Sequence, residues 1–242
     1  ITIGIADEAD APTIHATGQD NASGLYATHV LTIQNGATVN AASEGSYAMF
    51  ADGGLAIDGS TVSGSAAAEY YAAIGSVTTV NISNSAVNAS AKAGSAIASY
   101  EADVNISGSV VKAESPDTHY SVYGYTGGSL SGTWLDSTNP YVWDNIKNKA
   151  ENSVVILKDS GTVTGNLSLV RNAELRAGVA LNIPENTSLT VPDGVTFYNN
   201  GTVTLNGTFT NSGITICAEG SHTGGAATCA AAAACRFRDS FE

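Results

Sequence analysis

A repeat of about 24 residues dominates the first half of the chain. Three columns of apolar residues return at this interval, and each column keeps its own register. The columns are the triplets Leu31–Ile33, Leu55–Ile57, Val80–Ile82 and Val104–Ile106, the valines Val39, Val62, Val87 and Val111, and the set Leu25, Met49, Ile74, Ile97 and Val122. A period held by three columns requires a structure built from similar units, so it constrains the fold more than any other feature.

The pattern inside each unit identifies it as a coil of strands. In every triplet two apolar residues flank a polar or small residue, and such alternation is typical of a strand with one face turned inward. Three short strands form one rung of a parallel β-helix, whose rungs stack at roughly 4.8 Å. The leucine–asparagine consensus of leucine-rich repeats and the six-residue period of left-handed hexapeptide helices are both missing. The sequence therefore predicts an all-β fold, a right-handed parallel β-helix with three short strands per rung of about 24 residues.

A fourth column marks the bend between the first two strands of each rung. Asn35, Gly59, Asn84 and Gly108 occupy it in successive rungs. Asparagine and glycine are the residues that most readily adopt a left-handed backbone conformation. The column therefore predicts one repeated left-handed corner.

The pattern divides the chain into four parts. Residues 1–133 form the parallel β-helix with long rungs, and residues 134–153 form a connecting segment with a possible short helix. Residues 154–216 continue the β-helix with shorter rungs, since the triplets Leu167–Leu169, Leu181–Ile183 and Val203–Leu205 lie closer together. Residues 217–242 form a tail that contains all three cysteines, Cys217, Cys229 and Cys235.

Charge and composition exclude several classes of function. The formal net charge is −13, which argues against a nucleic-acid partner because too few cations are present to neutralise phosphates. No apolar run approaches the roughly 18–20 residues of a membrane span, so we expect no membrane insertion in this segment. The acids follow no metal-binding motif, and the sequence predicts no metal site and no cofactor.

Whole units of the chain resemble repetitive bacterial cell-surface proteins that carry right-handed parallel β-helix domains. The resemblance rests on units such as Asp103–Val111 and on the run Pro184–Val195. The tail resembles a small Cys-rich module of such proteins, although Arg238 stands where that module has a fourth cysteine. The resemblance implies an extracellular or cell-wall location and a role described as surface, adhesion-like or carbohydrate-associated.

The function expected from these features is a non-enzymatic structural or adhesion module, with glycans or host and cell-surface proteins as partners. The first alternative is a carbohydrate-binding module that uses an exposed aromatic stripe, and the second is a β-helix lyase or hydrolase that acts on polysaccharide. Hydrolysis of a glycosidic bond needs two neighbouring carboxylates, and Asp58 is the single acid in the outward column of the first strand. No catalytic residue is assigned. A groove that holds several acids with Lys112 or Arg171 would favour the enzyme.

Aromatic residues supply the candidate binding site. Because Leu25, Met49 and Val122 point inward, the residues that follow them point outward. Flat exposed rings suit stacking on sugars, so the glycan-stacking candidates are Tyr26, Phe50, Tyr123, Tyr71 and Tyr100, with Tyr125 beside them. The competing interpretation, which we favour at this point, is that residues 134–152 or the N-terminal segment pack over these rings.

Overall fold

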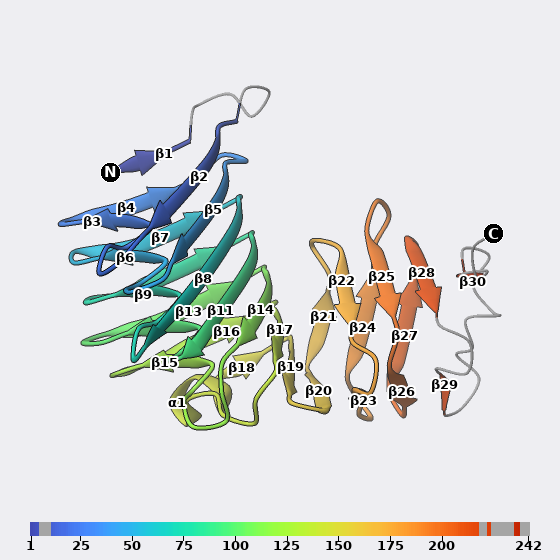
Figure 1. Cartoon of the computed structure of the whole chain (residues 1–242). Helices are drawn as coiled ribbons and strands as arrows, with labels where there is room; N and C mark the ends of the chain where they lie inside the picture. Colours follow the sequence, from blue (N-terminus) through green and yellow to red (C-terminus); the bar gives the residue numbers. More distant parts are fainter. Residues whose placement is uncertain (5–10, 218–221, 224–234, 238–242) are drawn as a thin grey trace, which may run out of the picture.

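The protein is an all-β solenoid. The computed structural model describes residues 1–4, 11–217, 222–223 and 235–237. It contains 57% strand and 2% helix, with stacked parallel sheets that form about 8 turns and rungs about 24 residues apart. The predicted parallel β-helix is confirmed. Figure 1 shows the early rungs stacked downward from the N-terminus and the later ones extending to the right.

Three sheets surround the interior of the early rungs. The first sheet contains β1 (Thr2–Ile3), β4 (Val30–Ile33), β7 (Gly54–Asp58), β10 (Val80–Ser83), β13 (Asp103–Ser107), β16 (Gly127–Ser131) and β18 (Ala150–Glu151). The second, called the shared sheet below, begins with β2 (Thr13–Gly18), β5 (Thr38–Ser43), β8 (Thr61–Glu69), β11 (Ala86–Ala93), β14 (Val110–Glu114), β17 (Trp134–Ser137) and β19 (Ser153–Leu157). The third contains β3 (Leu25–Ala27), β6 (Met49–Ala51), β9 (Ile74–Ser76), β12 (Ile97–Ser99) and β15 (Val122–Gly124).

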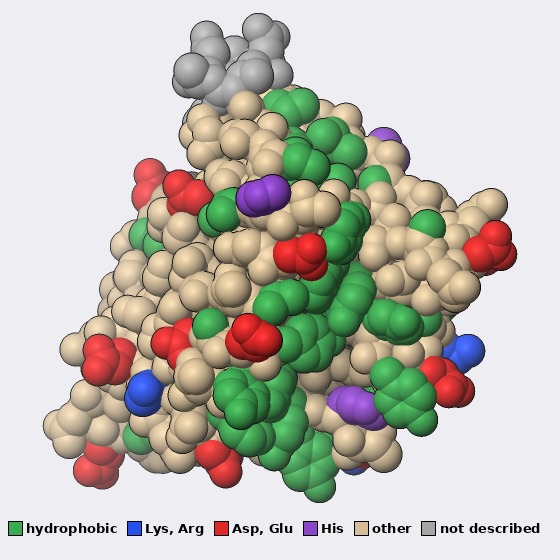
Figure 2. Space-filling view, turned by 90° about the vertical axis from the view of Figure 1, so that its left-hand side faces the viewer, with side chains coloured by type: hydrophobic (Ala, Val, Ile, Leu, Met, Phe, Trp, Pro, Cys, Tyr) green, Lys and Arg blue, Asp and Glu red, His purple; other side chains and the backbone are tan. Residues whose placement is uncertain are grey.

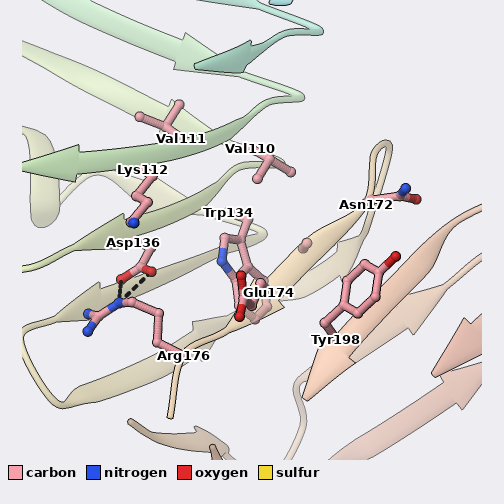
Figure 3. Close-up of a pocket in the computed structure, with 10 residues that line it drawn as sticks. Val110, Val111, Lys112, Trp134, Asp136, Asn172, Glu174, Arg176 and Tyr198 are labelled. Carbon is pink, nitrogen blue, oxygen red and sulfur yellow. Dashed lines mark hydrogen bonds and ion pairs between the residues drawn. The ribbon is translucent and has the colours of Figure 1, made fainter. Parts of the chain in front are cut away.

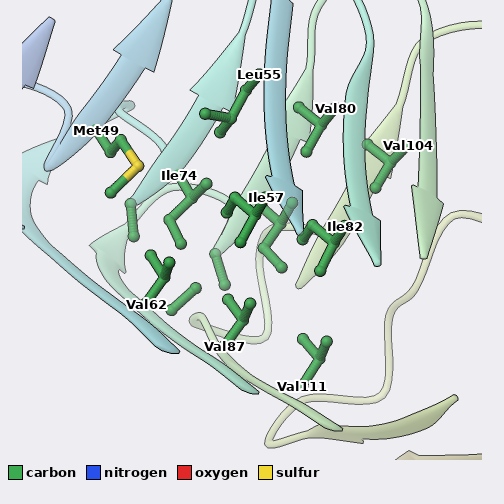
Figure 4. Packing of buried hydrophobic residues seen from close by; sticks show 14 of the residues in the cluster. Met49, Leu55, Ile57, Val62, Ile74, Val80, Ile82, Val87, Val104 and Val111 are labelled. Atoms are coloured by element: carbon green, nitrogen blue, oxygen red, sulfur yellow. The ribbon is translucent and has the colours of Figure 1, made fainter. Parts of the chain in front are cut away.

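The apolar columns of the sequence form the core of this first body (residues 1–157). Parallel pairing aligns each column, for example Leu55 with Val80 and Val80 with Val104. The column residues are almost all fully buried, and Figure 4 shows them pointing into the interior from all three sheets. Each rung buries its inner face only against its neighbours, so stacking is what stabilises it.

The left-handed corner is also confirmed. The backbone angle φ is +57° at Asn35, +59° at Gly59, +49° at Asn84 and +50° at Gly108, and the column continues in later rungs. A buried hydroxyl follows each of the last three of these corners, at Ser60, Ser85 and Ser109. The Ser85 Oγ accepts a hydrogen bond from the Ser60 amide at 3.1 Å, and the Ser109 Oγ accepts one from the Ser85 amide at 3.0 Å. These hydroxyls satisfy backbone donors that the change of strand direction would otherwise leave unpaired.

We expect two substitutions of Gly59, at the left-handed corner, to differ in their effect on the free energy of unfolding. Gly59→Asn should be nearly neutral, because asparagine already occupies this conformation at Asn35 and Asn84. Gly59→Val should lower the free energy of unfolding by about 1–2 kcal/mol, since a β-branched residue is strained at positive φ. A Cβ at this position meets nothing within 4 Å, so steric contact does not contribute. Urea unfolding of both variants measures the difference, and equal stabilities would contradict the assignment.

The segment between the two parts of the chain continues the solenoid and then closes its end. Residues Trp134–Ser137 form β17 and pair in parallel with β14. The short helix α1 (Asp144–Lys147) follows, and its Ile146 is fully buried in the first core together with Val142. Figure 1 shows α1 at the lower end of the first body.

A hairpin then reverses the chain. Strands β19 and β20 (Ser160–Thr164) pair antiparallel, with Leu157 opposite Ser160 and Lys158 at a φ of +60° in the turn. From β20 onward the shared sheet continues in parallel through β23 (Ala180–Ile183), β26 (Thr202–Leu205) and β29 (His222–Thr223). A fourth sheet contains β21 (Asn166–Ser168), β24 (Ser188–Val191) and β27 (Thr208–Asn211). A fifth contains β22 (Ala173–Leu175), β25 (Thr196–Asn199), β28 (Ile214–Cys217) and β30 (Cys235–Phe237).

The second body (residues 160–217) has its core on the opposite face of the shared sheet. In β17, Leu135 belongs to the first core and the adjacent Trp134 to the second. In β19, Val154 and Ile156 belong to the second core, whereas Val155 packs against the first. Strand direction and core side reverse together, so the coil keeps the same hand.

The end of the described chain carries a disulfide. Cys217 is 1% exposed and disulfide-bonded. Cys229 and the expected position of a fourth cysteine, Arg238, lie outside the described residues. Within the described ranges, no helix is long and apolar enough to cross a membrane.

Candidate functional site: an aromatic stripe on the third sheet

The outer face of the third sheet carries the predicted aromatic residues. Pairing places Tyr26 beside Phe50, and the column continues through Gly75 and Ala98 to Tyr123. Small residues at the two middle positions divide the rings into two groups. We call them the first aromatic group (Tyr26, Tyr47, Phe50, Tyr71 and Tyr100) and the second aromatic group (Tyr120, Tyr123, Tyr141 and Trp143), and together they form the aromatic stripe.

The first aromatic group is built around Tyr47. Its ring stacks on Phe50 with centroids 4.0 Å apart and meets Tyr71 edge-on at 4.8 Å. Tyr100, from a later rung, contacts both Tyr47 and Phe50, with its ring centroid 6.1 Å from that of Tyr47 and 6.2 Å from that of Phe50. Tyr26 extends the stack beyond Phe50, and the planes of the two rings are nearly parallel, at an interplanar angle of 7°. Such offset-stacked and edge-on contacts hold the rings in fixed positions.

The prediction that Phe50 is an exposed stacking residue is wrong. Phe50 is only 6% exposed, because Tyr47 covers it and its ring lies over Gly75. A Cβ at position 75 would lie 3.2 Å from Phe50 Cδ2, so the glycine makes room for the ring. Phe50 therefore supports the neighbouring tyrosines. Tyr26 is 47% exposed, while Tyr71 and Tyr100 are half-buried.

Part of the expected cover exists, at the second aromatic group. Trp143, from the segment before α1, packs edge-on against Tyr120 at 4.8 Å and against Tyr123 at 5.1 Å. Tyr123 is half-buried as a result. Among the described residues, the ring contacts of Trp143 are confined to the second aromatic group. Figure 2 shows a band of hydrophobic side chains running down this face, flanked by acidic ones.

Hydroxyl and carboxylate groups line the stripe. The Tyr26 hydroxyl donates to Asp52 Oδ2 at 2.5 Å, and this hydrogen bond raises the pKa of Tyr26. Burial raises the pKa of Tyr100, and its hydroxyl shares a hydrogen bond with that of Tyr47. The Tyr26 and Tyr100 phenols therefore stay neutral at physiological pH. The stripe offers flat apolar rings edged by hydrogen-bonding oxygens.

Sequence reasoning missed Tyr47, Tyr120, Tyr141 and Trp143. A signal for two of them was present, because Tyr47 and Tyr120 both precede an inward residue of the third strand by two positions. Tyr141 and Trp143 belong to the non-repetitive segment, so no column marks them. Tyr125 is 61% exposed at the turn after β15.

A second candidate site is a groove where the two bodies meet. It has a volume of about 280 Å³ and is lined by Val110, Val111, Lys112, Trp134, Asp136, Asn172, Ala173, Glu174, Arg176 and Tyr198 (Figure 3). The Arg176 Nε donates to both carboxylate oxygens of Asp136, at 2.8 and 2.7 Å, and this hydrogen bonding raises the pKa of Arg176. Arg176 also donates to the carbonyl of Lys158 at 2.7 Å, which fixes the hairpin turn.

This junction groove contains Lys112 with two acids, the grouping that would favour a polysaccharide-active enzyme. Asp136 is fully engaged by Arg176, and Glu174 is the one lining carboxylate that forms no ion pair with another described residue. Glu174 accepts a hydrogen bond from Asn200 Nδ2 at 2.7 Å. Arg171 lines no part of the groove and donates to the Asn84 carbonyl instead. The groove therefore lacks the pair of available carboxylates that hydrolysis requires.

No group of three or more His, Cys, Asp or Glu side chains in the described parts of the chain is placed to hold a metal ion.

Comparisons with known proteins found no relative of this chain. No protein-family model matches the chain, and no curated protein or solved structure matches it.

Proposed function

We propose that this chain is a non-enzymatic structural or adhesion module of an extracellular or cell-wall location, and that it binds carbohydrate along the aromatic stripe. One observation carries the proposal: in the first aromatic group Tyr26 is 47% exposed, and the rings of Tyr47, Tyr71 and Tyr100 are partly exposed. Among the described residues, the expected cover reaches only the second aromatic group, where Trp143 packs.

The geometry of the stripe suits an extended sugar chain. Successive rungs are separated by roughly 4.8 Å, a distance close to the length of one sugar unit in an extended polymer. A chain lying along the solenoid axis would therefore meet a new rung at each unit. Its apolar ring faces would lie against tyrosines, and its hydroxyls would reach groups such as Asp52 and the Tyr26 hydroxyl.

The electrostatics favour an uncharged glycan. The chain carries a net charge of −13, and acidic side chains flank the stripe in Figure 2. A polymer of uronic acids would be repelled by this field. The disulfide at Cys217 supports an extracellular location, because disulfides persist in oxidising compartments.

The proposal is tested by measuring how the wild-type chain and two variants bind to a glycan array. Tyr26→Ala combined with Tyr71→Ala removes two rings from the stripe and leaves Phe50 in place. The matched control is Tyr198→Ala, which removes a tyrosine of comparable exposure from the second body. We expect the double variant to raise the Kd at least tenfold, equivalent to about 1.4 kcal/mol, and the control to leave it unchanged.

Two further measurements make the result decisive. Circular dichroism melting must show that the double variant remains folded, and incubation with the bound polysaccharide should release no new reducing ends. Binding that survives in the double variant, or an array on which the wild-type chain binds nothing, would overturn the proposal. Release of reducing ends would overturn its non-enzymatic part.

A further inference from the structure

A small hollow lies beside the second aromatic group. It has a volume of about 310 Å³ and is lined by Asp117, Thr118, His119, Tyr120 and Tyr141. The first four residues come from the loop between β14 and β15, and Tyr141 comes from the segment between β17 and α1. Both segments lie outside the repeat, so the rung architecture does not require the hollow.

One buried side chain holds both walls of the hollow. Asn139 is 0% exposed, and its Nδ2 lies within hydrogen-bond distance of four acceptors in the first loop: the Ser115 Oγ at 2.5 Å and the carbonyls of Ser115, Pro116 and His119 at 3.3, 3.1 and 2.9 Å. Its Oδ1 accepts from the Tyr141 amide at 2.8 Å. A buried amide so completely used fixes the two segments relative to each other.

Two serines fix the same region from beneath. The Ser137 Oγ donates to the Ser121 Oγ at 2.7 Å, and both side chains are fully buried. The Ser121 amide donates to the Tyr141 carbonyl at 2.8 Å. The backbone of Tyr141 is therefore held on both its amide and its carbonyl side, and the hollow exists before any ligand arrives.

The lining combines an aromatic corner with hydrogen-bonding groups. The rings of Tyr120 and Tyr141 meet at 78° with centroids 6.4 Å apart, and they are 36% and 50% exposed. Asp117 pairs with Lys158 from the hairpin turn, at 2.9 Å between Nζ and Oδ2. The Thr118 hydroxyl hydrogen-bonds His119 Nδ1 at 3.0 Å. The pairing leaves the charged groups of the hollow balanced.

We propose that this hollow binds one uncharged hexose unit, a chain end or a branch, of the glycan held by the stripe. The inference rests on the proposed carbohydrate binding and deepens it by assigning a specificity subsite. A hexose ring has an apolar face, which fits the corner of Tyr120 and Tyr141. It also has an edge of hydroxyls, from which the Asp117 carboxylate can accept hydrogen bonds and with which the His119 imidazole can form them. The balanced charge of the hollow provides no net attraction for a uronate.

Ligand-observed NMR with monosaccharides tests the hollow apart from the rest of the stripe. The probes are the methyl glycosides of glucose, galactose and mannose, N-acetylglucosamine, and the charged counterparts glucuronate and galacturonate. We expect at least one uncharged probe to bind the wild-type chain and the uronates to bind at least tenfold more weakly. Tyr141→Ala and Asp117→Asn should each weaken the uncharged probe at least tenfold.

Two controls separate this proposal from the proposed function. Tyr125→Ala removes an exposed tyrosine that does not line the hollow, and it should leave the binding of the probe unchanged. Tyr26→Ala/Tyr71→Ala should weaken the polymer but not the monosaccharide. The assignment of the hollow as a hexose subsite is excluded by any of three results. These are full binding by both Tyr141→Ala and Asp117→Asn, no binding of any uncharged probe, or uronates that bind as tightly as the uncharged probes. Loss of polymer binding in Tyr26→Ala/Tyr71→Ala would still support the stripe in those cases.

Discussion

Replacement of Trp134 by alanine is expected to lower the free energy of unfolding by about 3–5 kcal/mol, the cost of truncating a large buried aromatic residue. Trp134 is 1% exposed although it lies on the outer face of the first body. Its ring meets Phe197 of the second body, with centroids 5.5 Å apart and an interplanar angle of 63°. Truncation leaves a cavity between the two bodies, where neither core can collapse to fill it.

Urea unfolding of the full chain measures this effect, and the chain contains its own control. Trp143 is the second of the two tryptophans, and it is half-buried at the surface in the second aromatic group. Trp143→Ala should cost clearly less than Trp134→Ala because less apolar area returns to water. Each variant keeps one tryptophan, so its fluorescence reports on one place. Equal costs for the two truncations would contradict the burial of Trp134 between the bodies.

The repeat predicts the first body closely because each column has one physical requirement. Leu55, Val80 and Val104 must all be buried, and a change of register by one residue would turn each of them to solvent. The corner is equally constrained, since Asn35 and Gly59 share a conformation that most residues avoid. Periodicity therefore determines which strands form, which face is inward and how they pair.

The stripe was predictable only in direction. The alternation of the third strand places Tyr26 and Phe50 on the outer face, where they lie. It does not show that Tyr47, from the preceding loop, covers Phe50 or that Gly75 makes room for the ring. Those contacts depend on the conformation of loops that differ between rungs, and so does the hollow organised by Asn139.

The reversal at residues 158–159 has a signal in the sequence, although a model with one inward face per strand does not account for it. The run Val154–Leu157 is apolar at every position, whereas the strands of the first body alternate. A continuous apolar run is typical of a strand buried on both faces, and β19 does lie between two cores. The run does not reveal which neighbour covers each face, because that depends on the antiparallel pairing of β19 with β20.

The ion pair at the same junction gives the second large effect. Asp136→Leu should lower the free energy of unfolding by about 3 kcal/mol, near the lower end for breaking a buried pair, because the side chain of Asp136 is 6% exposed and that of Arg176 only 26%. The loss arises from the guanidinium that remains without its carboxylate. Asp136→Leu/Arg176→Met removes both charges and should recover most of the stability, since apolar replacement of a buried pair is often neutral.

A surface pair provides the comparison. Lys112 and Glu114 lie 2.7 Å apart with side chains 45% and 36% exposed, and Glu114→Gln should cost less than about 1 kcal/mol. Urea unfolding at low and high salt measures all three variants, and the deficit of Asp136→Leu should persist at high salt because the site is shielded from solvent ions. A double variant as unstable as Asp136→Leu would show that Arg176 acts through the Ser137 and Lys158 carbonyls that it also binds. Recovery in the double variant would instead assign the junction's stability to the apolar contact of Trp134 with Phe197, with the ion pair setting how the second body is aligned on the first.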